Sequence, residues 1–169
     1  MDFISTRGGA PRANFAEVLL AGLAPDGGLY MPVEWPHIAD GDIAAFAGAR
    51  YQDVAFEILR RFTGQAFSAA DLRADIEAAY AGFDAPAIAP LSELGKDTWL
   101  LELFHGPTFA FKDIAMQVLA RLMDLELRAK GLHITIVGAT SGDTGSAAIE
   151  AFKGRHSVDI FILRSPCRA

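Results

Sequence analysis

The sequence predicts an α/β protein with two regions of different character. In residues 1–90, apolar residues repeat mostly at helical spacing, whereas residues 91–169 alternate short apolar runs with helical segments. Strands that alternate with helices are typical of a parallel sheet joined by right-handed crossovers. We therefore expect a mainly helical amino-terminal cap region (1–90), followed by a parallel-sheet α/β region (91–169).

The helices expected in the first region are marked by their ends as well as by their period. Asn14 can open a short helix that Gly22 ends, and Ser68 resembles an N-cap with Asp71 in the first turn. Pro and Gly residues between these segments favour turns. The elements expected, in order, are a helix over 14–20, a brief strand over 29–31, a helix over 51–62 and a helix over 69–81.

The second region has the order strand, helix, strand, helix, strand. Trp99 to Phe104 is typical of a buried strand, and helical spacing then extends from Ile114 to Lys130. A strand over 133–138, a helix over 146–153 and a strand over 158–163 follow. Ligands of parallel sheets bind beyond the carboxyl ends of the strands, so we expect the loops after these strands to converge on one ligand.

Composition excludes several classes of protein. The formal net charge of −6 argues against nucleic acid or an anionic membrane as a partner. One cysteine, Cys167, rules out an internal disulfide framework and fits a reducing compartment. The start of the chain lacks a signal-peptide pattern, and no apolar run approaches the roughly 20 residues of a membrane span. The sequence therefore predicts a cytoplasmic protein.

Lys112 is the first candidate for chemistry. It follows a Gly-Pro turn, lies among Phe109, Ala110 and Phe111, and opens the long helix. Apolar surroundings and the positive end of a helix both disfavour the ammonium form, and a neutral amine can attack an aldehyde. The alternative is a lysine whose stem lies on apolar surface while its ammonium group reaches water.

The second candidate is the loop that joins the strand at 133–138 to the next helix. Residues 138–146 crowd glycines, serines and threonines before a helix start, where free N–H groups and the helix dipole favour a carboxylate or phosphate. The glycines fit neither the dinucleotide nor the Walker pattern. The alternative is an ordinary turn in which Ser or Thr caps the helix.

These motifs resemble those of a known family. Phe104 to Asp113 (FHGPTFAFKD) is similar to the cofactor-lysine signature of threonine synthases, enzymes of the tryptophan-synthase-β fold type. Ala139 to Gly145 resembles their substrate-carboxylate loop. Ser5 to Gly8 and Gly22 to Pro32 resemble their amino-terminal pattern. The resemblance runs from Met1 to about Leu163, in order and without large gaps.

The resemblance implies a pyridoxal 5'-phosphate enzyme that converts O-phosphohomoserine and water to threonine and phosphate, a lyase of threonine biosynthesis. Lys112 would form the aldimine with the cofactor and move protons, and Asp143 would lie near the cofactor's 3-oxygen. The residues implied to bind substrate are Thr140, Ser141, Gly142 and Thr144, at its carboxylate, and Arg7, at its phosphate.

Two neighbours of the lysine have less specific roles. His105 either contacts substrate or is a hydrogen-bonded packing residue. Asp113 is expected to favour the first helical turn by its charge. His37, His133 and His156 are scattered and indicate no metal site.

Threonine synthases are much longer chains, so the resemblance also implies an α/β domain truncated after Leu163. The expectation is an amino-terminal fragment that lacks the loop for the cofactor phosphate. Two alternatives stay open: a related pyridoxal-phosphate enzyme acting on serine, threonine or O-acetylserine, or an inactive remnant that binds only an anion or a partner chain. The sequence gives no oligomeric state.

Overall fold

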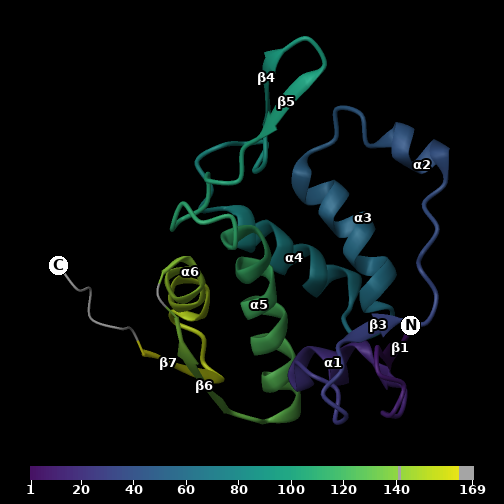
Figure 1. Ribbon diagram of the computed structural model, residues 1–169, viewed down its shortest axis with the longest axis vertical. Helices are drawn as coiled ribbons and strands as arrows, with labels where there is room; N and C mark the ends of the chain where they lie inside the picture. The colour runs from purple at the N-terminus through teal and green to yellow at the C-terminus, as the bar shows by residue number, and fades with distance from the viewer. Residues whose placement is uncertain (141, 164–169) are drawn as a thin grey trace. The chain divides into compact units, whose positions relative to one another are not determined.

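The computed structural model describes residues 1–140 and 142–163 (Figure 1). These described residues fall into two compact units, which divide between Ala74 and Asp75. The division into domains at residue 90 stays a prediction. The helices are α1 Phe15–Ala21, α2 Asp40–Ala45, α3 Tyr51–Thr63, α4 Ala69–Tyr80, α5 Asp113–Lys130 and α6 Asp143–Phe152. The strands are β1 Asp2–Ser5, β2 Ala13–Asn14, β3 Tyr30–Pro32, β4 Leu91–Gly95, β5 Thr98–Leu101, β6 Ile134–Ala139 and β7 Val158–Leu163.

The first unit combines a small antiparallel sheet with helices. The strand order is β2-β1-β3, and Phe3 lies opposite both Ala13 and Pro32. The brief strand predicted at 29–31 is β3. Neither β1 nor β2 was predicted, because strands of four and two residues are too short to show an alternating pattern.

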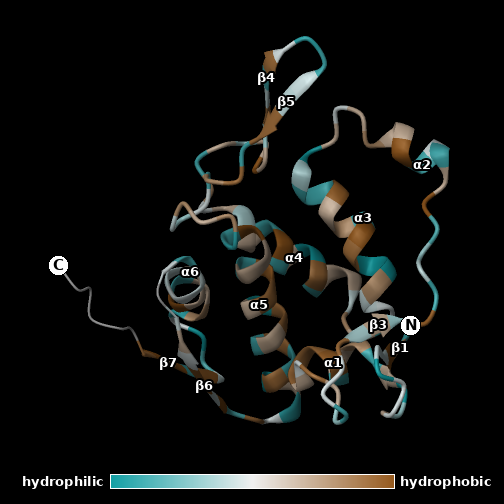
Figure 2. Ribbon diagram, viewed as in Figure 1, coloured by the Kyte–Doolittle hydropathy of each residue, from teal (hydrophilic) through white to brown (hydrophobic). Residues whose placement is uncertain are grey.

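Helices α1 and α4 begin where their predicted caps place them. The Asn14 side chain accepts a hydrogen bond from the Glu17 N–H (3.1 Å), and Glu17 accepts one from the Asn14 N–H (2.8 Å), which is a complete capping box. Ser68 likewise accepts a hydrogen bond from the Asp71 N–H (3.1 Å) ahead of α4. Along α3, apolar and polar residues alternate in blocks, as expected of an amphipathic helix (Figure 2).

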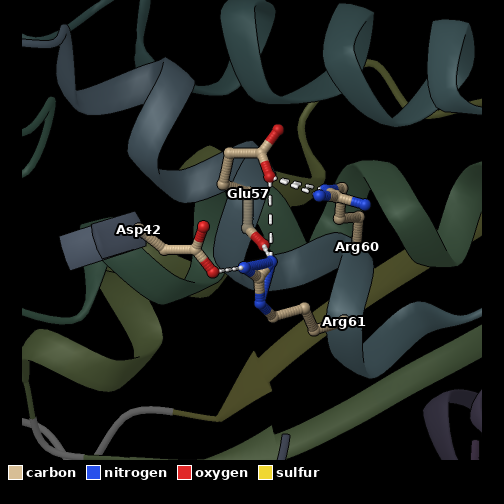
Figure 3. A network of polar contacts seen from close by, with 4 residues as sticks. All are labelled: Asp42, Glu57, Arg60 and Arg61. Atoms are coloured by element: carbon tan, nitrogen blue, oxygen red, sulfur yellow. Dashed lines mark hydrogen bonds and ion pairs between the residues drawn. The ribbon is translucent and has the colours of Figure 1, made fainter. Parts of the chain in front are cut away.

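An ion-pair network joins α2, which was not predicted, to α3 (Figure 3). The Arg61 guanidinium lies 2.9 Å from Asp42 Oδ2 and also donates to the Glu57 carbonyl oxygen (3.2 Å). The hydrogen bond from Arg61 holds the pKa of Asp42 below its ordinary value. Glu57 pairs in turn with Arg60 at 2.6 Å. Because the Asp42 and Arg60 side chains are about half exposed, water screens these ion pairs and we expect each to contribute little to stability.

The second unit contains the predicted parallel sheet. β6 and β7 run parallel, in register from Ile134 opposite Val158 to Ala139 opposite Leu163. Helices α5 and α6 pack against each other, and α6 packs on β7. Gly131, in the left-handed conformation (φ 64°), ends α5 as its position after the last periodic residue predicted. The helices and strands predicted between residues 114 and 163 are confirmed to within three residues.

One face of the sheet is covered and the other is exposed. Along β6 and β7, side chains that are half-buried or, at Val158, buried alternate with exposed ones, which include Val137 and Phe161. Alternation of this kind follows from the period of two along a strand when one face alone is covered.

The prediction for Trp99 to Phe104 was wrong in detail. The strand is shorter, β5, and pairs antiparallel with β4 in a separate two-stranded sheet; all four of its residues are exposed. Asp97, with φ 58°, closes the hairpin between them. A run of apolar residues cannot distinguish an exposed hairpin strand from a buried parallel one by its period.

Across residues 1–140 and 142–163, no helix combines the length and the apolar character that crossing a bilayer requires.

Candidate functional site

Lys112 lies in the wall of an apolar cavity. It is the residue at the amino-terminal cap of α5, its side chain is half-buried, and Nζ lies 4.5 Å from the centre of the Phe111 ring. The cavity has a volume of about 380 Å³, and its other lining residues are Leu103, Phe111, Ile114, Ala115 and Met116. A cavity of this size suits a small organic molecule. Among the described residues that line this cavity, Lys112 is the one with a charged or polar side chain.

The turn before Lys112 is held by its neighbour in the sequence. Asp113 is fully buried (0% exposed), and its carboxylate accepts hydrogen bonds from the N–H and the hydroxyl of Thr108, both at 2.7 Å. Asp113 lies in the first turn of α5, as expected. Its carboxylate has a second role that the sequence did not suggest, which is to close the loop that carries the lysine.

The loop after β6 leads directly into α6, which begins at Asp143, three residues earlier than predicted. Gly142 occupies the N-cap, and no side chain among the described residues caps the helix. The alternative of a Ser or Thr N-cap is therefore wrong. The first N–H groups of a helix have no partner within it, so this end of α6 is suited to an anion.

A second cavity, of about 300 Å³, lies at this loop. Thr140 and Gly142 line it together with Gly145, Ser146, Ile149 and Ile162. Asp143 and Thr144, in the first turn of α6, are exposed. Ser141 lies outside the described residues. The cavity therefore combines the helix N-terminus with hydroxyl groups. That this loop binds an anion stays a prediction.

Close packing at Gly145 fixes the shape of this loop. A Cβ at this position would lie 2.7 Å from Cγ2 of Thr140 and 3.0 Å from Cγ2 of Ile162. We expect Gly145→Ala to lower the free energy of unfolding by about 1–3 kcal/mol, measured by urea denaturation. Gly41→Ala is the matched control: it also replaces a helical glycine, but a Cβ there meets nothing within 4 Å. Equal stability of the two variants would contradict the packing argument.

His105 is bracketed by two carboxylates. Its Nδ1 lies 2.7 Å from Asp84 Oδ1, and its Nε2 lies 2.7 Å from Glu102 Oε2. Glu102 and, to a lesser degree, Asp84 raise the pKa of His105 above its ordinary value. The Ser92 hydroxyl, which donates to Glu102, and then His105 lower the pKa of Glu102. Both ring nitrogens are thus engaged, which assigns His105 the packing role.

Asp84, Ser92 and Glu102 were not singled out from the sequence. Asp84 lies 21 positions from His105, and no local pattern indicates the pairing. Despite this concentration of acidic and imidazole groups, the described part of the chain holds no cluster of three or more His, Cys, Asp or Glu side chains suited to a metal ion.

Arg7 belongs to the first unit, where Asp26 organises both amino-terminal motifs. The Asp26 carboxylate accepts hydrogen bonds from the Ser5 hydroxyl (2.7 Å) and from the N–H groups of Gly28 (3.0 Å) and Gly9 (2.8 Å). The Ser5 contact contributes most to the lowered pKa of Asp26. Nη1 of Arg7 donates to the Asp26 carbonyl oxygen at 3.0 Å, so the guanidinium has a defined position. The role of Asp26 had not been predicted.

The residues predicted to form the site thus lie in three places. Lys112 lines one cavity, Thr140 and Gly142 line another in the same unit, and Arg7 lies in the other unit. Among the described residues, none lines both cavities. The convergence of these groups on one ligand stays a prediction.

Comparison with known proteins gives consistent matches. The family model described as the threonine synthase N terminus matches residues 2–80. Threonine synthase from Pseudomonas aeruginosa is 50% identical over an alignment that covers 96% of this chain and 35% of that protein. Threonine synthase from Methylobacillus glycogenes is 45% identical, with 96% and 36% covered.

Solved structures agree with the sequences. A PLP-bound threonine synthase from Brucella melitensis superimposes with a TM-score of 0.94 at 53% identity, covering 96% of this chain and 35% of that one. Threonine synthase from yeast gives a TM-score of 0.91 at 38% identity, with the same coverage. The chain spans about a third of the length of these relatives. In sequence and in fold, it belongs to the threonine synthase family and corresponds to the amino-terminal part of its members.

Proposed function

We propose that this chain takes part in the pyridoxal-phosphate-dependent conversion of O-phosphohomoserine and water to threonine and phosphate. The observation that carries the proposal is the position of Lys112, a half-buried amine at the start of α5 in the wall of an apolar cavity. The relative from Brucella melitensis is described as bound to PLP, which supports the same cofactor here. A biosynthetic reaction on small polar molecules also supports the cytoplasm as the location.

The residues of the cavity fit the cofactor. An amine is the group that bonds to an aldehyde carbon, and apolar side chains give a flat aromatic ring a surface on which to pack. Phe111 and Met116 supply such surface beside Lys112. Asp143, at the start of α6, would lie near the cofactor's 3-oxygen.

The loop between β6 and α6 would bind the substrate carboxylate. Thr140 and Thr144 offer hydroxyl groups, and Gly142 and the first turn of α6 offer N–H groups. Ser141, outside the described residues, belongs to the same motif. Arg7, whose guanidinium is oriented by Asp26, would bind the substrate phosphate through paired N–H donors.

Each group has a defined task in the reaction. Bound pyridoxal phosphate supplies an electron sink for the charge left on Cα when its proton leaves. The Lys112 amine, once released by the substrate's own amine, accepts and returns protons at the substrate carbons. The loop holds the carboxylate, so the Cα–H bond keeps one orientation while phosphate leaves from Cγ and water adds at Cβ.

We expect reduction with borohydride in the presence of pyridoxal phosphate to label Lys112. The amine nitrogen bonds to the aldehyde carbon, the aldehyde oxygen leaves as water, and hydride reduces the C=N bond to a stable amine. Peptide mass spectrometry should find the added mass on Lys112 and find it absent in Lys112→Ala. Lys130→Ala, at the other end of α5, is the matched control and should label like the wild type. Equal labelling of Lys96, Lys130 and Lys153 would contradict the assignment.

An assay of products separates the reaction from that of a fold-related dehydratase. Phosphate release from O-phosphohomoserine supports the proposal, whereas pyruvate formation from serine supports the alternative. Labelling of Lys112 with neither product would assign the chain a cofactor-binding role without turnover.

A further inference from the structure

We propose that Asp113 is a positioning residue for Lys112: by holding Thr108, its buried carboxylate fixes the turn from which the lysine projects into its cavity. The inference deepens the proposed function and rests on it for the identity of the aldehyde that Lys112 meets. Asp113 itself is not among the described residues that line the cavity.

The contacts of Asp113 are concentrated on one residue. Oδ2 accepts a hydrogen bond from the Thr108 N–H and Oδ1 accepts one from the Thr108 hydroxyl, each at 2.7 Å. Both carboxylate oxygens therefore bind the residue five positions earlier in the chain. Hydrogen bonds to an ionised acceptor are shorter and stronger than neutral ones. An acidic residue in a first helical turn ordinarily acts on its own helix. Here the carboxylate instead binds Thr108, which precedes the helix, and so closes the loop between Thr108 and Asp113.

Burial makes this contact difficult to break. Asp113 is 0% exposed, and a buried carboxylate that loses its donors is left without compensation for the water it gave up. Gly106 preserves the space, because a Cβ there would lie 2.4 Å from Cβ of Asp113. In this arrangement of the turn the carboxylate is satisfied, and its position leaves no room for a side chain at residue 106.

The backbone between Thr108 and Asp113 includes a strained residue, Phe109, that we infer the Asp113–Thr108 contact holds in its conformation. Phe109 has φ 61°, a left-handed conformation that is unfavourable for a residue with a side chain. Phe109 is 72% exposed, so side-chain packing does not offset this strain. The hydrogen bonds around it do: the Phe109 N–H donates to Gly106 (3.1 Å), and the Asp113 N–H donates to Ala110 (3.0 Å).

Lys112 lies inside this closed turn. Its carbonyl oxygen accepts the Met116 N–H at 2.9 Å, which begins the helix on one side, and the Asp113–Thr108 contact fixes the other side. Release of Thr108 would let the backbone of Phe109 relax and would turn the Lys112 side chain away from Phe111. Asp113 thus acts on the amine through the backbone.

The test compares two buried carboxylates of α5 in the full chain. Asp113→Ala removes both hydrogen bonds to Thr108. Asp113→Asn retains them, because its amide oxygen can accept the Thr108 N–H and its amide N–H can donate to the hydroxyl. Asp124→Ala is the matched control: Asp124 is 4% exposed and accepts the Ser157 N–H at 3.0 Å, but does not contact the lysine loop. Thr108→Val, which removes only the hydroxyl, covers the case in which Asp113→Ala fails to fold.

Two readouts are measured. Without cofactor, hydrogen exchange at the Thr108 amide should accelerate in Asp113→Ala by about tenfold or more and stay near the wild-type rate in Asp113→Asn and Asp124→Ala. With pyridoxal phosphate and borohydride, labelling of Lys112 should slow by about tenfold or more in Asp113→Ala, less in Thr108→Val, and recover in Asp113→Asn.

Unchanged exchange and labelling in Asp113→Ala would overturn the inference, and so would unchanged labelling in Thr108→Val if Asp113→Ala does not fold. Slowing of the same size in Asp124→Ala would also overturn it, since the effect would then be general destabilisation. If the wild-type chain is not labelled at all, the proposed function fails, and the exchange rates alone decide whether Asp113 holds the turn.

Discussion

Gly106→Ala is expected to lower the free energy of unfolding by about 3 kcal/mol or more and to abolish labelling of Lys112 by pyridoxal phosphate. The added methyl group would lie 2.4 Å from Cβ and 2.6 Å from Oδ2 of Asp113, closer than packed atoms approach. Asp113 has no room to retreat, since it is fully buried and its carboxylate is bound to Thr108. The substitution must therefore either break these hydrogen bonds or deform the turn.

Gly82→Ala is the control for this change. A Cβ at Gly82, in the same unit, meets nothing within 4 Å, so we expect its free energy of unfolding to change by less than about 1 kcal/mol. Urea denaturation and the labelling assay together give the comparison. If Gly106→Ala were as stable as Gly82→Ala and still labelled at Lys112, the lysine turn would be far more adaptable than its contacts imply.

The parts of the fold that the sequence predicted are those specified by neighbouring residues. The predicted helix over 51–62 is α3, which ends one residue later, and the long helix after Lys112 is α5, which starts one residue earlier than predicted. The helical period sufficed for these two helices, whose N-caps make no side-chain hydrogen bond. Caps marked the starts of α1 and α4, where the cap contact joins residues three positions apart, at Asn14 and Ser68.

The parts that were missed depend on contacts that neither a hydrophobic period nor a cap pattern marks in the sequence. The hairpin of β4 and β5 is defined by its turn at Asp97, and β1 is defined by partners on both sides. Within the candidate site, the sequence indicated Lys112 and the loop at 138–146 by their residue types. It did not indicate that Asp113 binds Thr108 or that Asp84 binds His105, because the fold alone brings those groups together.

The stability of the chain is expected to depend on pH through His105. This residue lies between β5 and the turn that carries Lys112, and its imidazole contacts Asp84. Glu102 and Asp84 raise the pKa of His105 above its ordinary 6.5. The contribution of His105 to the free energy of unfolding is therefore complete below pH 6.5 and declines as the pH rises through the raised pKa. Ser92 and His105 lower the pKa of Glu102 below its ordinary 4.5, so its contribution is complete above pH 4.5 and declines as the pH falls through the lowered value. The cluster should therefore stabilise the chain most between pH 4.5 and 6.5.

His105→Gln tests this window, because glutamine can hydrogen-bond to one carboxylate but carries no charge. We expect the free energy of unfolding, measured with urea, to fall more at pH 5.5 than at pH 9 relative to the wild type at each pH. His133→Gln is the matched control: its Nε2 lies 3.8 Å from Asp159 Oδ2 and both side chains are largely exposed, so the pH dependence of its loss should be small. A loss in His105→Gln that is the same at both pH values would mean that His105 acts by packing and hydrogen bonding alone, without a charge shared between the two carboxylates.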